Sequence, residues 1–257
     1  MTMKKTMFLL AAMLLSLAGM AQMESGSSED WYVQGNAAYN EGDYEQSLAF
    51  YGQIVESGKE SADLYYNMGN TYYKMKQYPM AILYYEKALK LNPGDEDIRT
   101  NLEIANLAVV DKINVVPQSF IARWWNGMKT SLSADGWAWV SIVAFALFLI
   151  CLFVFLMARR RGLMKAGFYV GLLIAICLAF SVIFAVGNYR DMSHQDQAIV
   201  MTPTVTVKSS PSENSVDLFV LHEGAKVRVM SESNGWNQIK IADGSVGWLQ
   251  ADAMIVF

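Results

Sequence analysis

The sequence predicts a multidomain protein that combines an all-α helical array, a two-helix transmembrane hairpin and a small all-β barrel. Three observations support this assignment. A 34-residue period runs through the region 28–111, two uncharged apolar runs occupy residues 137–158 and 166–186, and apolar residues alternate with polar ones along segments of 199–257. These patterns belong to three kinds of structure, so one hydrophobic core cannot accommodate them all.

The N-terminus has the organisation of a secretory signal peptide. Lys4 and Lys5 precede an apolar stretch at 7–18, and the small residues Gly19 and Ala21 fit a cleavage site after residue 21. An apolar stretch of about twelve residues is too short to span a bilayer as a helix, and this order of segments is typical of exported proteins. We expect residues 1–21 to be a signal peptide. An uncleaved anchor is the alternative, and in both cases the chain from residue 22 leaves the cytoplasm.

The two apolar runs predict a membrane hairpin. Residues 137–158 and 166–186 contain no Asp, Glu, Lys, Arg or His, and each run is about 30 Å long as a helix, enough to cross the hydrocarbon core. The loop between them, 159–165, carries three arginines and one lysine without an acid. Basic residues in short loops stay in the cytoplasm. We therefore expect two spans in the cytoplasmic (inner) membrane, with both soluble domains on the extracytoplasmic, periplasmic side.

Composition excludes several functions. Ion and proton pathways are marked by charged residues within the spans, and these spans have none. The only cysteines, Cys151 and Cys177, lie in the apolar runs, where we expect them to pack as small apolar residues rather than form disulfides. Residues 23–111 carry fifteen acids and six bases. Because a phosphate backbone requires a basic surface, nucleic acid is not an expected partner.

A short amphipathic segment precedes the first span. Within 117–133, apolar residues recur at helical spacing, and Arg123 and Lys129 lie off that face. We predict an interfacial helix that contacts membrane lipid; packing against the preceding helical domain is the alternative. The apolar positions are Phe120, Ile121, Trp124, Trp125, Met128 and Leu132.

The 34-residue period identifies a helical repeat. The matched pairs are Trp31 and Tyr65, Gly35 and Gly69, Tyr39 and Tyr73, Tyr44 and Tyr78, and Tyr51 and Tyr85. The second copy resembles a tetratricopeptide repeat at Tyr65, Met68, Gly69, Tyr72, Tyr78, Ala81, Tyr85, Ala88 and Pro93. The resemblance implies two antiparallel helices per copy, with Gly69 and Ala81 at their close crossing and Tyr72 and Tyr85 filling the space between them. Residues 96–110 are expected to form a capping helix.

The first copy departs from the pattern at Ser47, Ile54 and Lys59, where the repeat has Ala, Ala and Pro. In tetratricopeptide proteins the first helix of each repeat lines a concave surface, and the resemblance places two sets of residues there. They are Tyr32, Asn36, Tyr39 and Asn40 in the first copy, and Tyr66, Asn70, Tyr73 and Lys74 in the second.

Tyrosine and asparagine can stack on side chains and hydrogen-bond an extended peptide. We therefore predict a protein-binding groove; packing of these tyrosines against the capping or interfacial helix is the alternative. A carboxylate clamp, as in chaperone cofactors, would use Asn36 and Asn67. It would also need Lys or Arg where Tyr32, Asp97 and Asn101 stand, so it is not expected.

After a linker at 187–198, the region 199–257 shows short period-two runs, such as Val205 with Val207 and Ile239 with Ile241, separated by turn residues. The segment resembles bacterial SH3 domains at Val207–Pro211, Leu221–Gly224, Gly235–Trp236 and Asp243–Leu249. That resemblance implies a small barrel. Trp236, which follows a glycine turn, is a candidate binding residue. The family contains both protein-interaction modules and cell-wall peptide binders, and both possibilities stay open.

Catalytic chemistry is not expected. His194 and His222 are the only histidines, neither has a Cys or a second His at metal-ligand spacing, and no phosphate loop or nucleophile motif is present. We predict that the chain is not an enzyme and has no catalytic residue, metal site or cofactor.

The order of signal peptide, tetratricopeptide repeats, membrane hairpin and SH3 domain resembles BatE-type proteins of the Bacteroides aerotolerance operons. The resemblance implies a scaffold for other membrane or periplasmic proteins, among them Bat-type proteins with von Willebrand A domains, in aerotolerance or envelope stress. The alternative is an envelope sensor that binds peptidoglycan through the SH3-like domain.

Overall fold

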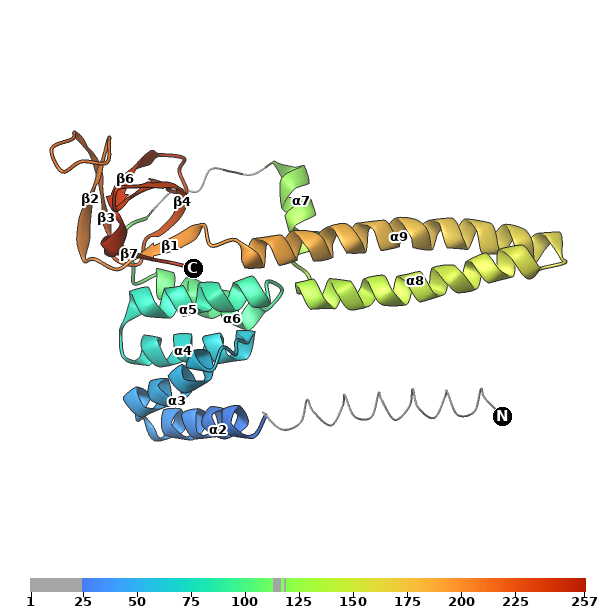
Figure 1. Ribbon diagram of the computed structural model, residues 1–257, viewed down its shortest axis with the longest axis horizontal. Coiled ribbons are helices and arrows are strands. Elements are labelled where there is room, and N and C mark those ends of the chain that lie inside the picture. Colours follow the sequence, from blue (N-terminus) through green and yellow to red (C-terminus); the bar gives the residue numbers. More distant parts are fainter. Residues whose placement is uncertain (1–24, 113–116, 118) are drawn as a thin grey trace. The chain divides into compact units, whose positions relative to one another are not determined.

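The computed structural model describes residues 25–112, 117 and 119–257 (Figure 1). The signal peptide expected at 1–21 lies outside these residues and stays a prediction. The described chain divides into two parts, 25–60 and 61–257, and each is described by itself.

The first part is a pair of helices, α2 (Ser25–Glu41) and α3 (Tyr44–Glu56). Gly42 reverses the chain between them with a φ of +85°, and the Asp43 side chain caps α3 by accepting a hydrogen bond from the Gln46 backbone N–H at 3.1 Å. The helices cross closely at Gly35, where an added Cβ would lie 2.4 Å from a ring carbon of Tyr51. The absence of a side chain at Gly35 is therefore what allows Tyr51 to be buried.

The second part begins with the equivalent pair, α4 (Ala62–Lys74) and α5 (Tyr78–Leu91). Ser61 caps α4 through a hydrogen bond from the Leu64 N–H at 3.1 Å. A Cβ at Gly69 would lie 2.6 Å from the Tyr85 ring, and Ala81 is completely buried. The predicted close crossing is confirmed. Tyr72 differs from expectation, because it is only half-buried.

The predicted capping helix follows as α6 (Glu96–Asn106), which ends earlier than the expected 96–110. Asp95 caps it by accepting hydrogen bonds from the backbone N–H groups of Asp97 and Ile98. Ile98 and Leu102 face inward and are buried, and α6 packs against α5. The second copy therefore has an apolar partner on its C-terminal side.

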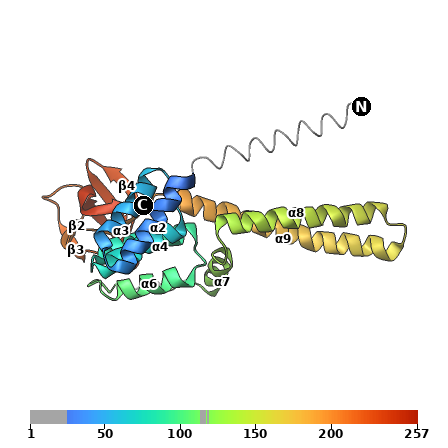
Figure 2. The ribbon, with the colours of Figure 1, turned by 90° about the horizontal axis from the view of Figure 1, so that it is seen from below.

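The next two long helices are α8 (Ala134–Met157) and α9 (Arg161–Ser193), which lie side by side (Figure 2). Both are long and apolar enough to cross a membrane. The connection between them is shorter than the expected 159–165, because α9 already begins at Arg161. The second helix also continues to Ser193 through most of the expected linker, 187–198.

Small residues let α8 and α9 approach each other. A Cβ at Gly167 would lie 3.0 Å from the Cys151 carbonyl oxygen, and Gly171 lies against the same residue. Further along the pair, the hydroxyls of Ser141 and Ser181 are 2.8 Å apart. Small residues four apart, together with interhelical hydrogen bonds, are how helices associate in a membrane.

A shorter helix, α7 (Phe120–Lys129), occupies the middle of the predicted amphipathic segment. Trp125 packs edge-on against Phe184 of α9, with ring centroids 5.0 Å apart, whereas Phe120 and Ile121 are exposed. This helix therefore packs against α9, a contact that neither sequence-based alternative included. Lipid contact of its exposed apolar side stays a prediction.

The corner between α7 and α8 is anchored by a buried amide. The Asn188 Nδ2 group donates to the carbonyl oxygens of Lys129 and Leu132, both at 2.9 Å. Trp137 Nε1 donates to the same Lys129 oxygen at 2.9 Å. These bonds satisfy backbone carbonyls that the end of α7 leaves without helical partners.

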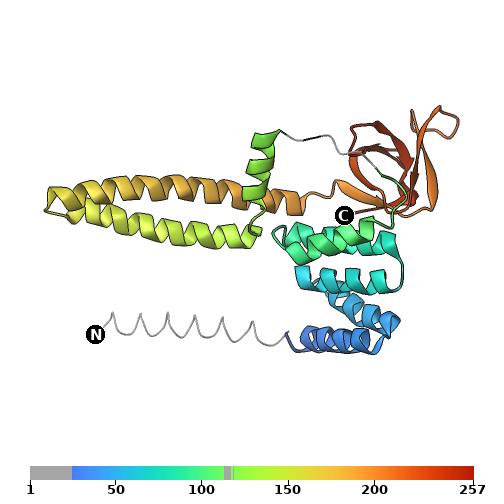
Figure 3. The same ribbon diagram turned by 180° about the vertical axis from the view of Figure 1, so that it is seen from behind.

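The C-terminal region forms a seven-stranded antiparallel sheet (Figure 3). Its strands are β1 (Gln197–Val200), β2 (Thr204–Lys208), β3 (Asp217–His222), β4 (Lys226–Ser233), β5 (Trp236–Lys240), β6 (Val246–Gln250) and β7 (Met254–Val256), with a 3₁₀ turn at Ala251–Ala253. The strand order is β3-β2-β6-β5-β4-β1-β7. The sheet is open, with β3 and β7 at its edges, so the predicted barrel is not confirmed.

The sheet core follows the predicted alternation. Val207, Ile239 and Leu249 are completely buried and pack in one apolar cluster. The hairpin between β4 and β5 turns at Asn234 and Gly235, which have φ values of +50° and +78°. Two consecutive residues in this region are typical of the tight turn that matches the twist of paired strands.

Candidate functional site

The predicted binding residues of the second copy lie on α4. Tyr66, Asn70 and Tyr73 are spaced four and three residues apart, which places them on one face of the helix. Asn70 is at the centre of a hydrogen-bond network. Its Oδ1 accepts from the hydroxyl of Tyr85 at 2.7 Å and from the Nδ2 group of Asn101 at 2.9 Å. Asn101 also donates to the Tyr66 hydroxyl at 2.9 Å.

The first copy repeats this arrangement. The Tyr51 hydroxyl donates to Asn36 Oδ1 at 2.7 Å, the same length as the Tyr85–Asn70 bond. The rings of Tyr32 and Tyr51 have centroids 6.1 Å apart, as do those of Tyr66 and Tyr85. Residues 34 apart therefore adopt the same geometry in both copies.

A second ring contact is also duplicated. Tyr39 packs against Tyr44 with centroids 5.6 Å apart, and Tyr73 packs against Tyr78 at 5.5 Å. Each contact joins the end of the first helix of a copy to the start of its second helix. The tyrosines at these positions thus stabilise the inter-helix turn and still leave part of each ring at the surface.

These contacts give the asparagines a role in folding. From the sequence, these asparagines are expected to hydrogen-bond an extended peptide, and a buried amide must find partners. In the structure, each asparagine accepts a hydrogen bond from the buried tyrosine of its own copy. The contacts of Asn70 use Oδ1, which fixes the orientation of its amide and leaves the Nδ2 group as a donor.

Sequence reasoning did not assign Asn101 to this surface. It was considered only as a position where a carboxylate clamp would have a basic residue. The signal that identifies it is the repeat period, because Asn101 follows Asn67 by 34 residues. The period thus continues into α6 and supplies the partner of Asn70 and Tyr66.

The remaining predicted residues differ in position. Lys74 is exposed in the last turn of α4, next to the half-buried Tyr73. Trp236 is half-buried at the start of β5, where it pairs with Ser233 and Gln250 in the sheet. It lies in the sheet and is not part of the tyrosine and asparagine network on α4.

A second aromatic cluster lies on other faces of α4 and α5. Tyr72 and Tyr84 stack with centroids 5.2 Å apart, and Lys87 Nζ lies 5.4 Å from the Tyr84 ring centre. Burial raises the pKa of Tyr84 to about 12, and the charge and hydrogen bond of Tyr72 add to the rise. Burial also raises the pKa of Tyr72. Both phenols are therefore neutral at physiological pH.

The second copy also contacts the β-sheet. Asp111 accepts a hydrogen bond from the His222 backbone N–H at 2.7 Å, and its second oxygen lies 2.8 Å from His222 Nδ1. Nearby, Lys226 pairs with Glu86 of α5 at 2.6 Å. Gly224 lies so close to Val109 that an added Cβ would approach its side chain to 2.7 Å.

Metal binding finds no support in the part of the chain that the structure describes, where no group of three or more His, Cys, Asp or Glu side chains could hold an ion. Within the described residues, His222 lies against Asp111 and His194 is exposed at the end of α9.

Comparison with known proteins identifies the second copy. Residues 62–95 match the family model of the tetratricopeptide repeat, so this segment is such a repeat. No curated protein matches the chain. Among solved structures, the chain is similar to one described as "YrrB: a TPR protein with an unusual peptide-binding site". The identity is 18%, the coverage is 71% of this chain and 87% of that chain, and the TM-score is 0.31. No enzymatic family is indicated.

Proposed function

We propose that this chain is a membrane-anchored scaffold that binds protein partners through the surface of its tetratricopeptide copies. The observation that carries this proposal is the duplicated face. Half-buried rings and amides lie at equivalent positions of α4 and α2, namely Tyr66, Asn70 and Tyr73 in the second copy and Tyr32, Asn36 and Tyr39 in the first. The exposed Lys74 follows them on α4. Packing fixes these side chains, which reduces the entropy lost when a partner binds.

The donor group of Asn70 suits an extended peptide. Because Tyr85 and Asn101 hold its Oδ1, the Nδ2 group can donate to a partner backbone carbonyl. Tyr73 offers an aromatic surface beside it, and Lys74 adds a positive charge. A partner segment with an acidic or hydroxyl-bearing side chain matches this set.

The C-terminal sheet is proposed as an SH3-like module that supports the same scaffold role, with Trp236 as a contact residue. The motifs after Val207 carry that assignment. The partners are proposed to be membrane or periplasmic proteins of the Bat type, including those with von Willebrand A domains, in aerotolerance or envelope stress. The second candidate function is recognition of peptidoglycan by this module, for which the same motifs are the basis.

The test of the groove uses the native membrane. Partners crosslinked to the full chain are identified by mass spectrometry, and the double variant Tyr73→Ser, Lys74→Glu is compared with wild type. We expect a loss of most crosslinked partner, because aromatic anchors at interfaces contribute roughly 2 kcal/mol or more. The matched control is Tyr84→Ser, Lys87→Glu in the second aromatic cluster. Equal partner recovery from wild type and the α4 variant would remove α4 as the binding surface.

Peptidoglycan binding has its own test. The full chain in detergent is incubated with purified sacculi and sedimented, and Trp236→Ala is compared with wild type. Sedimentation that depends on Trp236 would favour the envelope-sensor function. A chain that stays in the supernatant would leave the protein-scaffold function as the sole candidate.

Membrane orientation is tested by cysteine labelling. In a background with Cys151→Ala and Cys177→Ala, single cysteines replace Ser212 in the sheet domain or Gly162 at the start of α9. We expect a membrane-impermeant reagent to label position 212 from the periplasm and to leave position 162 unlabelled. The reverse pattern would contradict the proposed periplasmic location of both soluble domains.

A further inference from the structure

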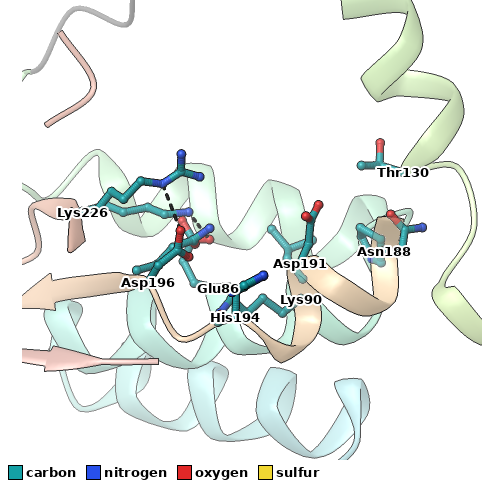
Figure 4. Close-up of a pocket in the computed structure, with 12 residues that line it drawn as sticks. Glu86, Lys90, Thr130, Asn188, Asp191, His194, Asp196 and Lys226 are labelled. Atoms are coloured by element: carbon teal, nitrogen blue, oxygen red, sulfur yellow. Dashed lines mark hydrogen bonds and ion pairs between the residues drawn. The ribbon is translucent and has the colours of Figure 1, made fainter. Parts of the chain in front are cut away.

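A polar pocket lies where α5, α9, β1 and β4 meet (Figure 4). Its volume is about 270 Å³, just below the roughly 300–1,000 Å³ of sites that hold a whole small-molecule ligand. Charged side chains dominate its lining. The acids are Glu86, Asp191 and Asp196, and the bases are Lys90, Lys226 and Arg228.

The depth of the pocket relative to a membrane follows from α9. The apolar run of this helix ends at Val186, and the pocket residues Asn188 and Asp191 follow two and five residues later. At 1.5 Å per residue these positions lie about 3 and 7.5 Å beyond the apolar run. The head-group layer on each side of a bilayer is of similar thickness, about 5–7 Å. With α8 and α9 in a membrane as proposed, the side of the pocket formed by Asn188 and Asp191 would lie at the level of the lipid head groups.

The charged side chains of the pocket form ion pairs with one another, but the bases keep hydrogen-bond donors that these pairs do not use. Lys226 uses one of its three donors on Glu86, and Arg228 approaches Asp196 through Nε at 3.3 Å, which leaves its other guanidinium nitrogens. Both side chains are about half exposed. An anionic group can thus reach donors of two bases that lie two residues apart on β4.

The remaining charged residues of the pocket lining are Asp191 and Lys90. Asp191 contacts Lys129, and its side chain is 70% exposed. Lys90 is held by the backbone oxygens of His194 and Phe257 at 2.6 and 3.0 Å, so its ammonium is occupied by protein carbonyls. Burial lowers the pKa of Lys90, an effect that the nearby charge of Asp196 opposes. Among the three acids of the pocket, Asp191 has the most exposed side chain, 70% against 13% for Glu86 and 39% for Asp196. Its carboxylate is therefore the one that an added cation can reach.

We propose that this pocket binds a phosphate ester that carries a primary amine, as in the head group of phosphatidylethanolamine. The phosphate contacts Lys226 and Arg228, and the ammonium contacts Asp191. The inference rests on the proposed membrane anchoring of the chain.

The lining discriminates among lipid classes. A purely anionic head group meets three carboxylates, which offset the three bases. A choline group has no N–H donor, and quaternary ammonium ions are bound by aromatic side chains, whereas the lining residues include no Phe, Tyr or Trp. A primary ammonium can donate hydrogen bonds to Asp191. The pocket chemistry thus favours ethanolamine over choline and glycerol head groups.

The experiment uses the full chain in nanodiscs of defined composition and measures the lipids retained after transfer to detergent. We expect retention of phosphatidylethanolamine over phosphatidylcholine and phosphatidylglycerol. Arg228→Gln and Asp191→Asn should each reduce it roughly tenfold, the effect of one charge-assisted hydrogen bond. The matched controls are Arg190→Gln and Asp135→Asn. Each removes one charge of the same sign as its pocket counterpart, near the base of the hairpin but outside the pocket lining.

Soluble glycerophosphoethanolamine in competition distinguishes the source of the ligand. If soluble glycerophosphoethanolamine displaces the lipid at a comparable concentration, the pocket binds the head group alone and the ligand can be soluble. If it does not displace the lipid, the acyl chains also contribute to binding and the ligand is the lipid. Equal retention of the three lipids, or a preference that both pocket variants keep, overturns the proposal. Alkaline extraction separates this failure from failure of the proposed function, because a chain released from membranes by carbonate is not anchored by α8 and α9.

Discussion

The two helical copies have the same geometry but differ in how well each position suits it. Position for position, the first copy has Ser47 where the second has Ala81, Gly42 where the second has Lys76, and Asp43 where the second has Gln77. Gly42 and Asp43 suit the turn and the helix cap of the first copy better than Lys76 and Gln77 suit those of the second. Ala81 suits the buried core position of the second copy better than Ser47 suits that of the first. The tetratricopeptide family model matches residues 62–95, which form the second copy. The two copies therefore differ in which of these positions limits their stability.

The largest effect is expected at the shared glycine. Gly69→Ala should destabilise the chain by about 2 kcal/mol, because the new methyl group displaces Tyr85 and disturbs its bond to Asn70. Gly35→Ala should do the same in the first copy. The measurement is chemical denaturation of the full chain in detergent, followed by circular dichroism. Gly52→Ala is the control, since its Cβ meets open space within α3, and it should be neutral or stabilising.

Ser47 is the next position. Its hydroxyl is fully buried and has no hydrogen-bond partner among the described residues. Ser47→Ala should stabilise the first copy by about 1–2 kcal/mol, because an unsatisfied polar group is removed and alanine favours the helix. Hydrogen exchange of the α2 and α3 amides measures the effect locally. The reciprocal change, Ala81→Ser, should weaken α4 and α5. Faster exchange in Ser47→Ala would contradict this reading of the core.

The N-terminal cap of α5 can be improved by introducing the aspartate that caps the equivalent helix of the first copy. Gln77 makes no side-chain cap hydrogen bond, although its backbone (φ −87°, ψ 69°) is close to that of Asp43 (φ −83°, ψ 77°). Gln77→Asp should stabilise the chain by about 1 kcal/mol, through a hydrogen bond to the first turn of α5. The midpoint of thermal unfolding reports the gain. Gln77→Asn tests whether the charge is needed, and a lower midpoint for both variants would show that the cap cannot form.

Alkaline pH should affect the second copy selectively. Tyr84 has its pKa raised to about 12, whereas the equivalent residue of the first copy is Phe50. Because the folded state holds the phenolic proton more tightly than the unfolded chain, this stability is present below pH 10 and lost as pH rises from about 10 to 12. After solvent screening, the loss is on the order of 1 kcal/mol. Tyr84→Phe should flatten the pH dependence of unfolding in this window, and an unchanged slope would contradict it.

The smallest effect is expected at the turn of the second copy. Lys76 has a φ of +61°, in the region that Gly42 occupies in the first copy. Lys76→Gly should relieve this strain and stabilise the chain by up to about 1 kcal/mol, less the entropy that glycine adds to the unfolded state. Lys76→Asn is a useful comparison, because asparagine tolerates this conformation. Destabilisation by both substitutions would show that the lysine side chain contributes contacts of its own.

Periodicity in the sequence was enough to predict most of the fold. Local sequence patterns predict the helical pairs, the close approach at Gly69, the two apolar helices and the β-strands. Each of these patterns depends on residues that are near one another in the sequence. The open strand order of the sheet did not follow, because alternation specifies which side of a strand is buried and not which strands become neighbours.

The site was predicted less completely. Spacing placed Tyr66, Asn70 and Tyr73 on one face, but could not show that Asn70 accepts from Tyr85 and Asn101. Those bonds join residues 15 and 31 positions apart, and they depend on how helices pack. The pocket beside Asp191 was missed for the same reason, since its lining comes from segments that no local pattern connects.

The continuity of α9 has a mechanical consequence. This helix runs unbroken for 33 residues, about 50 Å, and only three residues separate its end at Ser193 from β1. The short connection couples the sheet closely to α9, so a rotation of α9 about its axis would also turn the sheet. One residue inserted after Val186 would rotate the residues that follow it by about 100° about the helix axis. The register of this helix thus determines which side of the sheet faces away from α9.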